Sequence, residues 1–441
     1  MKNILVIGAG RSASSLIKYL LDNAATENWQ VTVADVSIDL VKQKTGNHTN
    51  ARAIAFDINN QQQREEEIKN ADIVISMLPA TMHISVAKDC VRFKKHLVTA
   101  SYVSKEMQEL NNEAKQSGII LLNECGLDPG IDHASAMKVI DEIHNNGGEL
   151  ISFKSFCGGL VAPESNDNPW GYKFSWNPRN VILAGQGTAQ YIENGEYKYI
   201  PYNRLFTQTD TVEMKGVGKY DAYANRDSLS YRKVYGIEKI PTMLRGTLRN
   251  EGYCKAWNVF VQLGLTDDTY KIEASDTLTY NQLVKAFLPQ GNKSTIEKLI
   301  AFMGNELDAE TLSKIEWTGI LSDEKIKLSN ATPAQILQEL LERKWLLKPH
   351  DKDMIVMQHQ FSYISNKETK HITSSLVVKG EDQTYTAMAA TVGLPLAIAT
   401  KLILQGKITA RGVVIPTIKE IYQPLLGELE TLGVKFEEEY N

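Results

Sequence analysis

The chain has 441 residues, of which 43% are hydrophobic and 23% are charged, which allows two or three globular domains with real cores. The formal net charge is −5 and no Lys/Arg cluster stands out, which argues against a nucleic-acid partner. The four cysteines lack metal-ligand spacing and indicate reduced thiols. Because no signal-peptide pattern and no apolar run near the ~20 residues that span a bilayer is found, we expect a soluble, cytoplasmic protein.

Short apolar strands alternate with helical patterns through residues 1–130. The run KNILVIGAG at 2–10 precedes apolar positions at helical spacing, and a later helix ends at Gly118. Five more strands are predicted at 30–37, 51–58, 72–79, 96–101 and 119–124. Apolar strands that alternate with helices indicate a parallel sheet covered on both faces. The predicted fold class is therefore α/β, with a Rossmann-type doubly wound domain.

The pattern changes after residue 148, where strands alternate with long loops and are followed by a helical stretch. Thr332 before Pro333 is typical of an N-cap followed by proline at the first helical position. Two late strands are predicted at 353–364 and 371–380, and the chain is helical again from Thr384. We expect this tail to pack on the first domain. The predicted domains are a discontinuous Rossmann domain at 1–130 and 384–441, an α/β domain at 131–276 and 349–383, and a helical subdomain at 277–348.

The segment GAGRSA at 8–13 lies between a predicted strand and a predicted helix and fits the pattern G-x-G-x-x-A. Gly8 permits the tight turn, and Gly10 lets the backbone approach a pyrophosphate at the helix N-terminus. Ala13 allows close packing of helix and strand. The motif alone is weak, but its strand–turn–helix context predicts a dinucleotide site.

The residue that ends the second strand distinguishes NAD from NADP. It is Asp35, which would hydrogen-bond the ribose hydroxyls of NAD and repel a 2′-phosphate. Arg11 is the only basic residue close by, so NAD is favoured over NADP. Asp57 ends the third strand and is expected near the adenine or as a turn cap. Leu78 and Pro79 end the fourth strand and are expected to border the cofactor.

The segment NECGLDPGIDH at 123–133 follows the sixth strand and carries more turn residues than a connection needs. Asp132 is expected to cap the helix that follows, which leaves Asp128 for a ligand. Ser101 and Tyr102 follow the fifth strand. Since ligands bind outside the carboxyl ends of such strands, these residues are expected to face the substrate.

The strings that carry a family resemblance extend over nearly the whole chain. NECGLDPGIDH, SFCGGLVAPESNDNPWGYKFSW (155–176), NRDS (225–228) and RGTLRNEGY (245–253) resemble the glutamate-forming saccharopine dehydrogenases, also called saccharopine reductases. SMLPATMHISVAKDC (76–90), VTASYVS (98–104) and TVGLPLAIATKLIL (391–404) fit as well. The resemblance implies a Rossmann domain, an α/β domain for substrate binding and dimerisation, and a small helical domain. It implies that the protein is a homodimer that interconverts saccharopine with L-glutamate and 2-aminoadipate 6-semialdehyde in lysine metabolism, using NAD or NADP.

The resemblance also implies particular contacts. The saccharopine contacts would be Ser101, Tyr102, Asp128, Arg226, Thr247, Leu248 and Arg249. The cofactor contacts would be Gly8, Gly10, Arg11, Ser12, Ala13, Asp35, Asp57, Ile58, Leu78, Pro79, Thr99, Leu127, Asp128 and Trp176. Fungal members have an arginine near the end of the second strand and use NADP, whereas this chain has Asp35 there and is more similar to the NAD-using animal branch.

Saccharopine carries three carboxylates and a secondary amine, so its site needs local positive charge. Arg226, Arg245 and Arg249 supply planar forks suited to carboxylates. Each of them alone is also explained as a surface salt bridge, and Arg245 most of all. Asp128, Tyr102 and Cys157 are the catalytic candidates near the amine, and no single general base is assigned. Cys157 and Tyr102 are also explained as ordinary packed residues. The hypothesised reaction is loss of the amine proton and of a hydride, then hydrolysis of the imine. His83, His96 and His133 are expected to be packed or surface residues, with no metal site.

Two other functions remain open. A carboxynorspermidine or carboxyspermidine dehydrogenase would keep the fold, but its more cationic substrate disfavours a pocket with Arg226 and Arg249. A catalytically silent NAD-binding regulator would keep Gly8, Gly10 and Asp35, but would have no need for Asp128 and Tyr102 beside the arginines.

Overall fold

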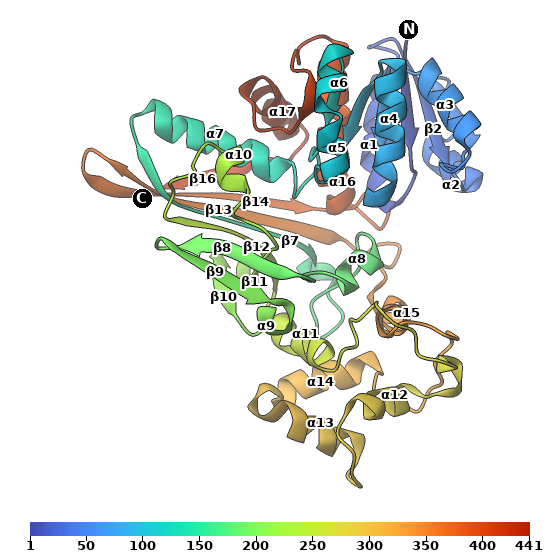
Figure 1. The fold of residues 1–441 in the computed structure, drawn as a ribbon, viewed down its shortest axis with the longest axis vertical. Coiled ribbons are helices and arrows are strands. Elements are labelled where there is room, and N and C mark those ends of the chain that lie inside the picture. Colours follow the sequence, from blue (N-terminus) through green and yellow to red (C-terminus); the bar gives the residue numbers. More distant parts are fainter. The chain divides into compact units, whose positions relative to one another are not determined.

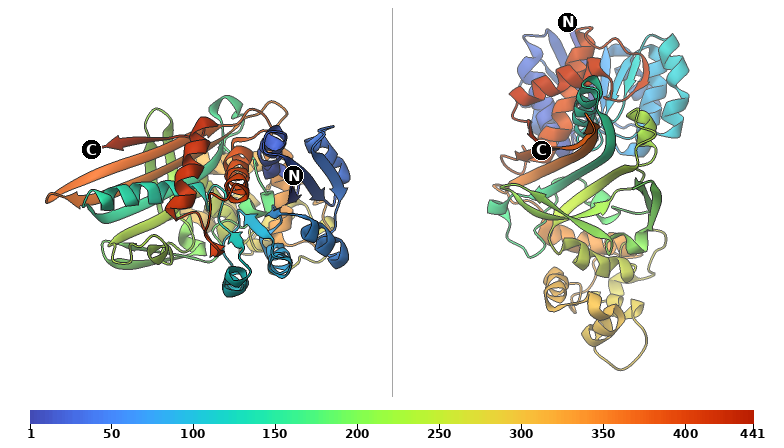
Figure 2. Two further views of the ribbon diagram at one scale, coloured as in Figure 1. Left: turned by 90° about the horizontal axis from the view of Figure 1, so that it is seen from above. Right: turned by 90° about the vertical axis from the view of Figure 1, so that its left-hand side faces the viewer.

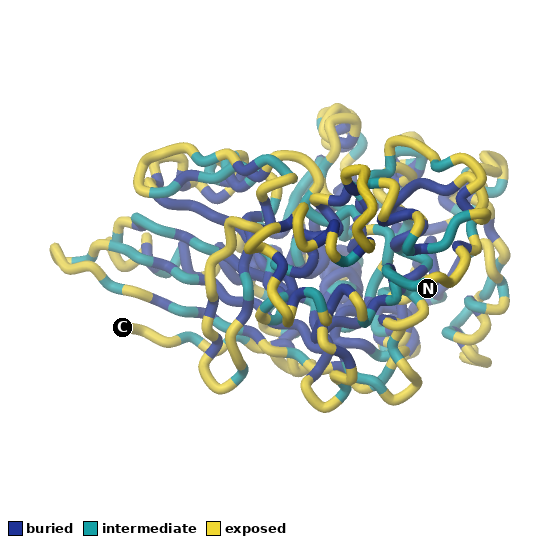
Figure 3. The backbone as a smooth tube through the Cα atoms, turned by 90° about the horizontal axis from the view of Figure 1, so that it is seen from below, coloured by how far each residue is buried: buried dark blue, intermediate teal, exposed yellow.

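The computed structural model describes residues 1–441 and divides into two compact units. Unit 1 contains residues 1–150 and 363–441, and unit 2 contains residues 151–362. Strands are mostly buried and connecting loops are mostly exposed (Figure 3). The separate helical subdomain at 277–348 stays a prediction.

Unit 1 contains a seven-stranded sheet in the order β15-β6-β5-β4-β1-β2-β3. Figure 1 labels β2 of this sheet among the helices of the unit. All its pairings are parallel, which is the doubly wound arrangement with one additional edge strand. The predicted fold class is confirmed, although β15 was not predicted. The strands are β1 Lys2–Ile7, β2 Trp29–Asp35, β3 Ala51–Ala55, β4 Ile73–Ser76, β5 His96–Thr99, β6 Ile120–Leu122 and β15 Gly412–Val414.

Helices cover both faces of this sheet (Figure 2). Alternate strand residues such as Leu5 and Ile7 join a buried cluster with the helices after β3 and β4, and their neighbours point to the other face. The helices are η1 Arg11–Ala13, α1 Ser14–Ala24, α2 Ile38–Thr45, α3 Gln61–Asn70, η2 Ala80–Met82, α4 His83–Phe93, α5 Lys105–Glu109, α6 Asn111–Gln116, α7 Ile131–Asn145, α16 Ala387–Leu404 and α17 Lys419–Thr431. Outside the sheet, β14 Glu368–Lys379 pairs with β16 Phe436–Tyr440 in antiparallel fashion.

Helix α16 comes from the C-terminal part of the chain and packs against α1, β4 and β5. Gly393 makes this close approach possible, because a Cβ there would lie 2.9 Å from the Leu16 backbone nitrogen. By length and hydropathy α16 could cross a bilayer, but 78% of it is buried inside the protein, as in a core helix. The prediction that no apolar run approaches such a length was therefore wrong.

Unit 2 is built on a mostly antiparallel sheet. Strand β12 pairs in parallel with β7 and antiparallel with β11, which in turn pairs with β10. A hairpin of β8 and β9 joins β12 at Met243, and β13 lies on the other side of β7. The strands are β7 Glu149–Val161, β8 Thr188–Glu193, β9 Glu196–Pro201, β10 Thr209–Met214, β11 Gly218–Ala224, β12 Thr242–Asn250 and β13 Asp353–Ser365.

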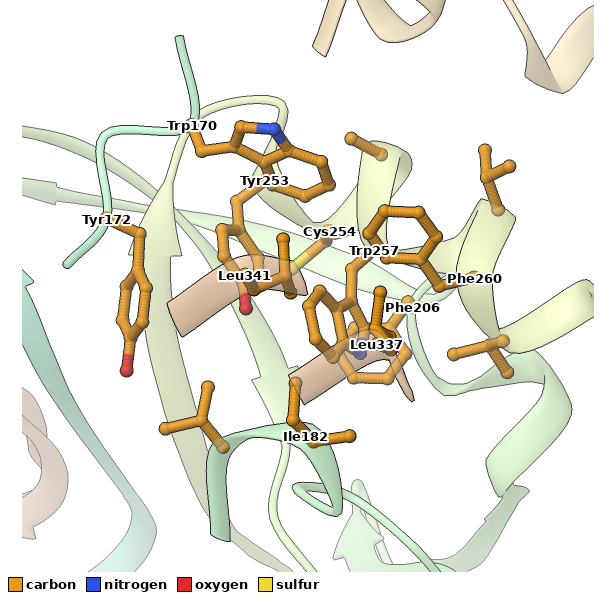
Figure 4. Close-up of a cluster of buried hydrophobic side chains, with 14 of the residues drawn as sticks. Trp170, Tyr172, Ile182, Phe206, Tyr253, Cys254, Trp257, Phe260, Leu337 and Leu341 are labelled. Atoms are coloured by element: carbon orange, nitrogen blue, oxygen red, sulfur yellow. The ribbon is translucent and has the colours of Figure 1, made fainter. Parts of the chain in front are cut away.

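An aromatic core holds the helices of unit 2 to this sheet (Figure 4). Trp170 stacks on Phe260 with ring centroids 5.6 Å apart, and Tyr253 stacks on Trp257 at 5.6 Å. Thr332 caps α15 in a capping box with Pro333 in the first turn, as predicted. The helices are η3 Pro163–Ser165, α8 Pro178–Ile182, α9 Tyr202–Leu205, α10 Tyr231–Val234, α11 Tyr253–Gln262, η4 Ser275–Thr277, α12 Tyr280–Phe287, α13 Thr295–Met303, η5 Gly304–Glu306, α14 Ala309–Thr318 and α15 Pro333–Trp345.

Candidate active site

The glycine loop follows β1 and leads through η1 into α1. Gly8 has φ +106°, and a Cβ there would lie 3.0 Å from the Met77 carbonyl oxygen, so glycine is required. Gly10 is exposed, and a Cβ there would meet nothing within 4 Å. Ala13 is fully buried beneath the loop. The open approach to the Gly10 backbone at the start of a helix fits the pyrophosphate of a dinucleotide.

Asp35 lies against this loop at the end of β2. One carboxylate oxygen accepts a hydrogen bond from the Ala9 N–H at 2.7 Å and the other from the Ser37 N–H at 3.0 Å. The carboxylate is half-buried, so it stays accessible where the ribose of a dinucleotide is expected.

Lys44 was missed as a cation near the glycine loop. Its Nζ donates to the Gly10 carbonyl oxygen and to Ser14 Oγ, both at 2.7 Å. Burial lowers the pKa of Lys44 to about 8, and the nearby Asp35 opposes this shift. Arg11, the cation that the sequence indicated, is exposed on the same loop beside the half-buried Ser12. No local sequence pattern predicts the position of Lys44, because only the fold brings the last turn of α2 against α1.

The other predicted cofactor residues of unit 1 follow strand ends. Asp57 is exposed, and its Oδ1 accepts from the Asn59 N–H at 2.9 Å, so it forms the turn that was its alternative role. Ile58 is buried, Leu78 is half-buried and Pro79 is exposed. Thr99 and Leu127 are buried, at 1% and 5% exposure.

His83 occupies the centre of a buried network at the carboxyl ends of β4 and β5. Its Nδ1 lies 2.8 Å from Ser76 Oγ, and its Nε2 lies 2.7 Å from Ser101 Oγ. Thr99 Oγ1 is a more distant neighbour of Nε2, at 3.4 Å. Burial lowers the pKa of His83 to about 4, so the ring is neutral at physiological pH. A lone histidine such as His83 predicts an ordinary packed or surface residue, although His83 begins the helix after a strand that is expected to border the cofactor.

The segment 123–133 forms a tightly closed loop. The Asp128–Pro129 bond is cis. Gly130 has φ +148°, and a Cβ there would overlap the Gly126 backbone at 2.1 Å. The Gly126 N–H donates to the Pro129 carbonyl at 3.0 Å. The two glycines are therefore needed to fold the segment back on itself at the carboxyl end of β6.

Three acids of this loop have different environments. Glu124 is buried, where it accepts from the Val103 N–H at 3.0 Å and lies 2.9 Å from His133 Nε2. Asp132 is buried in the first turn of α7 and accepts from the Gly130 N–H at 2.6 Å. The prediction that Asp132 is the N-cap was wrong, because the N-cap is Gly130 and has no side chain. Asp128 alone is partly exposed, near Ser101 and the 39% exposed Tyr102 on adjacent strand ends.

In unit 2, Arg249 lies in a box of tyrosines. Its guanidinium carbon is 5.3 Å from the ring centre of Tyr172, 5.5 Å from that of Tyr253 and 5.9 Å from that of Tyr223. Arg249 is 4% exposed, its Nη1 donates to the Leu248 carbonyl, and its Nε has no partner. Burial raises the pKa of each of the three phenols, so no phenolate neutralises the guanidinium. A buried cation without an anion is suited to a carboxylate ligand.

The fold brings residues predicted as catalytic, substrate and cofactor contacts close to Arg249. Cys157, at 7% exposure, pairs with Thr247 across β7 and β12, and Thr247 pairs with Tyr223 on β11. The Trp176 indole N–H donates to the Tyr172 hydroxyl at 3.3 Å. Leu248 is fully buried.

The other two arginines have separate positions. Arg226 is exposed just beyond β11, with φ 34°. Arg245 is only 5% exposed, with its guanidinium 4.3 Å from the ring centre of Tyr231, so its interpretation as a surface residue was wrong. No group of three or more His, Cys, Asp or Glu side chains could hold a metal ion.

Comparison with known proteins finds family matches over nearly the whole chain. Residues 4–122 match the family described as "Saccharopine dehydrogenase NADP binding domain", and residues 126–434 match "Saccharopine dehydrogenase C-terminal domain". The chain belongs to the saccharopine dehydrogenase family. The predicted resemblance is thereby confirmed, and the family description names NADP rather than NAD.

Individual members of the saccharopine dehydrogenase family are similar over the whole chain. The NADP(+), L-glutamate-forming saccharopine dehydrogenase of Saccharomyces cerevisiae is 37% identical over 97% of both chains. Its counterpart from Pyricularia oryzae is 35% identical over 99% of this chain and 98% of that protein. The mitochondrial alpha-aminoadipic semialdehyde synthase of Mus musculus is 35% identical, and this chain spans 47% of its length. The solved L-Glu-forming saccharopine dehydrogenase from Saccharomyces cerevisiae superposes with a TM-score of 0.90, at 36% identity and with both chains fully covered.

Proposed function

We propose that this protein is an L-glutamate-forming saccharopine dehydrogenase, which interconverts saccharopine with L-glutamate and 2-aminoadipate 6-semialdehyde. Full-length similarity to enzymes of that name supports the reaction. The buried Arg249 without an anionic partner carries the assignment from the structure, because a ligand carboxylate would complete its environment. A carboxylated polyamine would bring additional positive charge to this site and is disfavoured.

We propose that the nucleotide is bound by the loop from Gly8 to Ala13 and by Asp35. When bound, the nicotinamide supplies the hydride chemistry. In unit 1, Ser101, Tyr102 and Asp128 are the proposed substrate contacts at the carboxyl ends of β5 and β6. In unit 2, Arg226, Thr247 and Arg249 are the proposed contacts of substrate carboxylates. Asp128, Tyr102 and Cys157 are the candidates for the proton transfers on nitrogen and water.

NAD is the cofactor that we favour, although NADP is named for the fungal relatives. A carboxylate at the end of β2 repels a 2′-phosphate, and Asp35 is fixed there by two backbone N–H groups. Lys44 weakens this argument, since its charge partly offsets that of Asp35. We also propose a cytoplasmic homodimer, which sizing chromatography and cell fractionation would test.

The deciding experiment is the initial rate of nicotinamide reduction by purified protein with saccharopine, with NAD and NADP in parallel. Turnover with a strong NAD preference supports both the reaction and the role of Asp35. Turnover that favours NADP supports the proposed reaction but refutes the role of Asp35 in selecting NAD. Folded protein that binds NAD but has no activity on saccharopine refutes the proposal in favour of a silent regulator, and activity on carboxynorspermidine would identify the polyamine enzyme.

A further inference from the structure

Three side chains at the carboxyl ends of β4 and β5 form a chain of hydrogen bonds: Ser76, His83 and Ser101. Ser76 is 1% exposed and His83 is 4% exposed, whereas Ser101 is half-buried. This series of hydrogen bonds therefore runs from the interior to the surface on which the substrate is expected.

The direction of these hydrogen bonds follows from Ser76. The only partner of its hydroxyl is His83 Nδ1, at 2.8 Å. If Nδ1 carried the ring hydrogen, the Ser76 hydrogen would be buried without an acceptor, which is unfavourable. Ser76 therefore donates to Nδ1, and the hydrogen of the neutral ring is on Nε2.

The Nε2–H then determines what Ser101 presents to a ligand. It donates to Ser101 Oγ at 2.7 Å, and the alternative partner Thr99 Oγ1 lies 3.4 Å away, at the outer limit of a hydrogen bond. Since Ser101 Oγ accepts this bond and has no other partner in the chain, its own hydrogen is left to point outward. A hydroxyl that already accepts one hydrogen bond and still has its own hydrogen to donate favours an acceptor such as a carboxylate.

We propose that Ser76 and His83 fix Ser101 as a hydrogen-bond donor to a carboxylate of the substrate. The identity of that carboxylate as one of saccharopine rests on the function proposed above. His83 is a positioning residue, because it acts through Ser101. Its low pKa supports this role, since a protonated ring would lose the lone pair that accepts from Ser76.

The position of the His83 ring hydrogen is tested by ¹⁵N NMR of the histidine-labelled, full-length protein. The signals of His83 are assigned by their absence from the spectrum of His83→Gln. We expect the hydrogen on Nε2 in the wild type, and a loss of this preference in Ser76→Ala. A hydrogen on Nδ1 in the wild type would overturn the proposal. This measurement needs no substrate, so it is independent of whether saccharopine is turned over.

The consequence for binding is tested by saccharopine kinetics. Ser101→Ala is expected to raise KM for saccharopine by about 10- to 150-fold, as for one hydrogen bond to a charged group, with the Kd of NAD unchanged. Ser76→Ala and His83→Leu should raise KM in the same direction. The KM of His83→Gln, whose amide can still donate to Ser101, should be raised less than that of His83→Leu. His144→Gln on the exposed face of α7 is the matched control.

Two kinetic results would refute the proposal: an unchanged KM in Ser101→Ala, or a raised KM there with normal values in Ser76→Ala and His83→Leu. If the wild type has no activity on saccharopine, the proposed function fails first. Calorimetric binding of L-glutamate to wild type and Ser101→Ala then decides whether this hydroxyl serves a carboxylate, and equal affinities would overturn the inference.

Discussion

Replacement of Arg249 by methionine separates a binding role from a structural one. Methionine keeps much of the side-chain volume inside the tyrosine box and removes the charge. Burial of an ion without a counter-ion costs several kcal/mol. Three ring contacts of about 0.5–2 kcal/mol each and a charged hydrogen bond to Leu248 of about 1.5–3 kcal/mol offset that cost. Arg249→Met should therefore change the free energy of unfolding by no more than about 2 kcal/mol, in either direction.

The same substitution should strongly lower the affinity for saccharopine. Loss of one partner of a buried charge pair costs about 2–5 kcal/mol, which is roughly a 30-fold to several-thousand-fold loss in affinity. Arg249→Lys keeps the charge but not the planar fork, so its affinity for saccharopine should lie between those of the wild type and Arg249→Met. Since Arg249 and the glycine loop belong to different units, the affinity for NAD should be unchanged.

Three measurements check this reasoning: kcat/KM for saccharopine, the Kd of NAD, and urea unfolding with and without saccharopine. Saccharopine at 100 times its Kd should stabilise the wild type by about 2.7 kcal/mol and should have little effect on Arg249→Met. A normal kcat/KM in Arg249→Met would refute the binding role. A loss of stability far above 2 kcal/mol, with normal saccharopine binding by the folded fraction, would show that Arg249 is a structural residue.

Four further outcomes are expected. Asp35→Ala should lower the ratio of kcat/KM with NAD to that with NADP by about tenfold or more, and an unchanged ratio would remove Asp35 from the ribose site. Asp128→Ala should sharply lower kcat/KM for saccharopine with a normal Kd for NAD, so wild-type kinetics would exclude Asp128 from the site. Gly393→Ala should destabilise the protein by about 1–3 kcal/mol in urea unfolding, because its Cβ would press on Leu16. The control Gly427→Ala, on the open face of α17, should stabilise the protein by up to about 1 kcal/mol. Equal effects of the two substitutions would contradict the close packing at Gly393. Because the pKa of His83 falls from 6.5 in the unfolded chain to about 4 in the native protein, the stability that it contributes is complete above 6.5 and is lost as the pH falls toward 4. Between pH 7 and pH 5 the loss should be about 2 kcal/mol, smaller in His83→Gln, and an equal loss in both proteins would refute the assignment.

The sequence predicted those features that depend on neighbouring residues. The six strands of the first sheet were found from apolar runs, and the Thr332 cap was found from its local pattern. Asp128 was correctly placed at a strand end, because turn residues determine where a strand stops.

Features that depend on distant contacts were not predicted. Lys44 and His83 have no local signal, because their partners lie on other elements of the sheet. Tyr172, Tyr223 and Tyr253 are separated along the chain and meet only around Arg249. Strand β15 has three residues, too few for a periodic pattern.

The close contact of α16 with α1 at Gly393 has a consequence for synthesis on the ribosome. The strands β1 to β6 emerge first, but the helix that covers β4 and β5 is translated only after the whole of unit 2. Until then the nascent nucleotide-binding sheet has an uncovered apolar face. A fragment that ends at residue 150 should accordingly aggregate or recruit chaperones, and the C-terminal segment supplied in trans should rescue it.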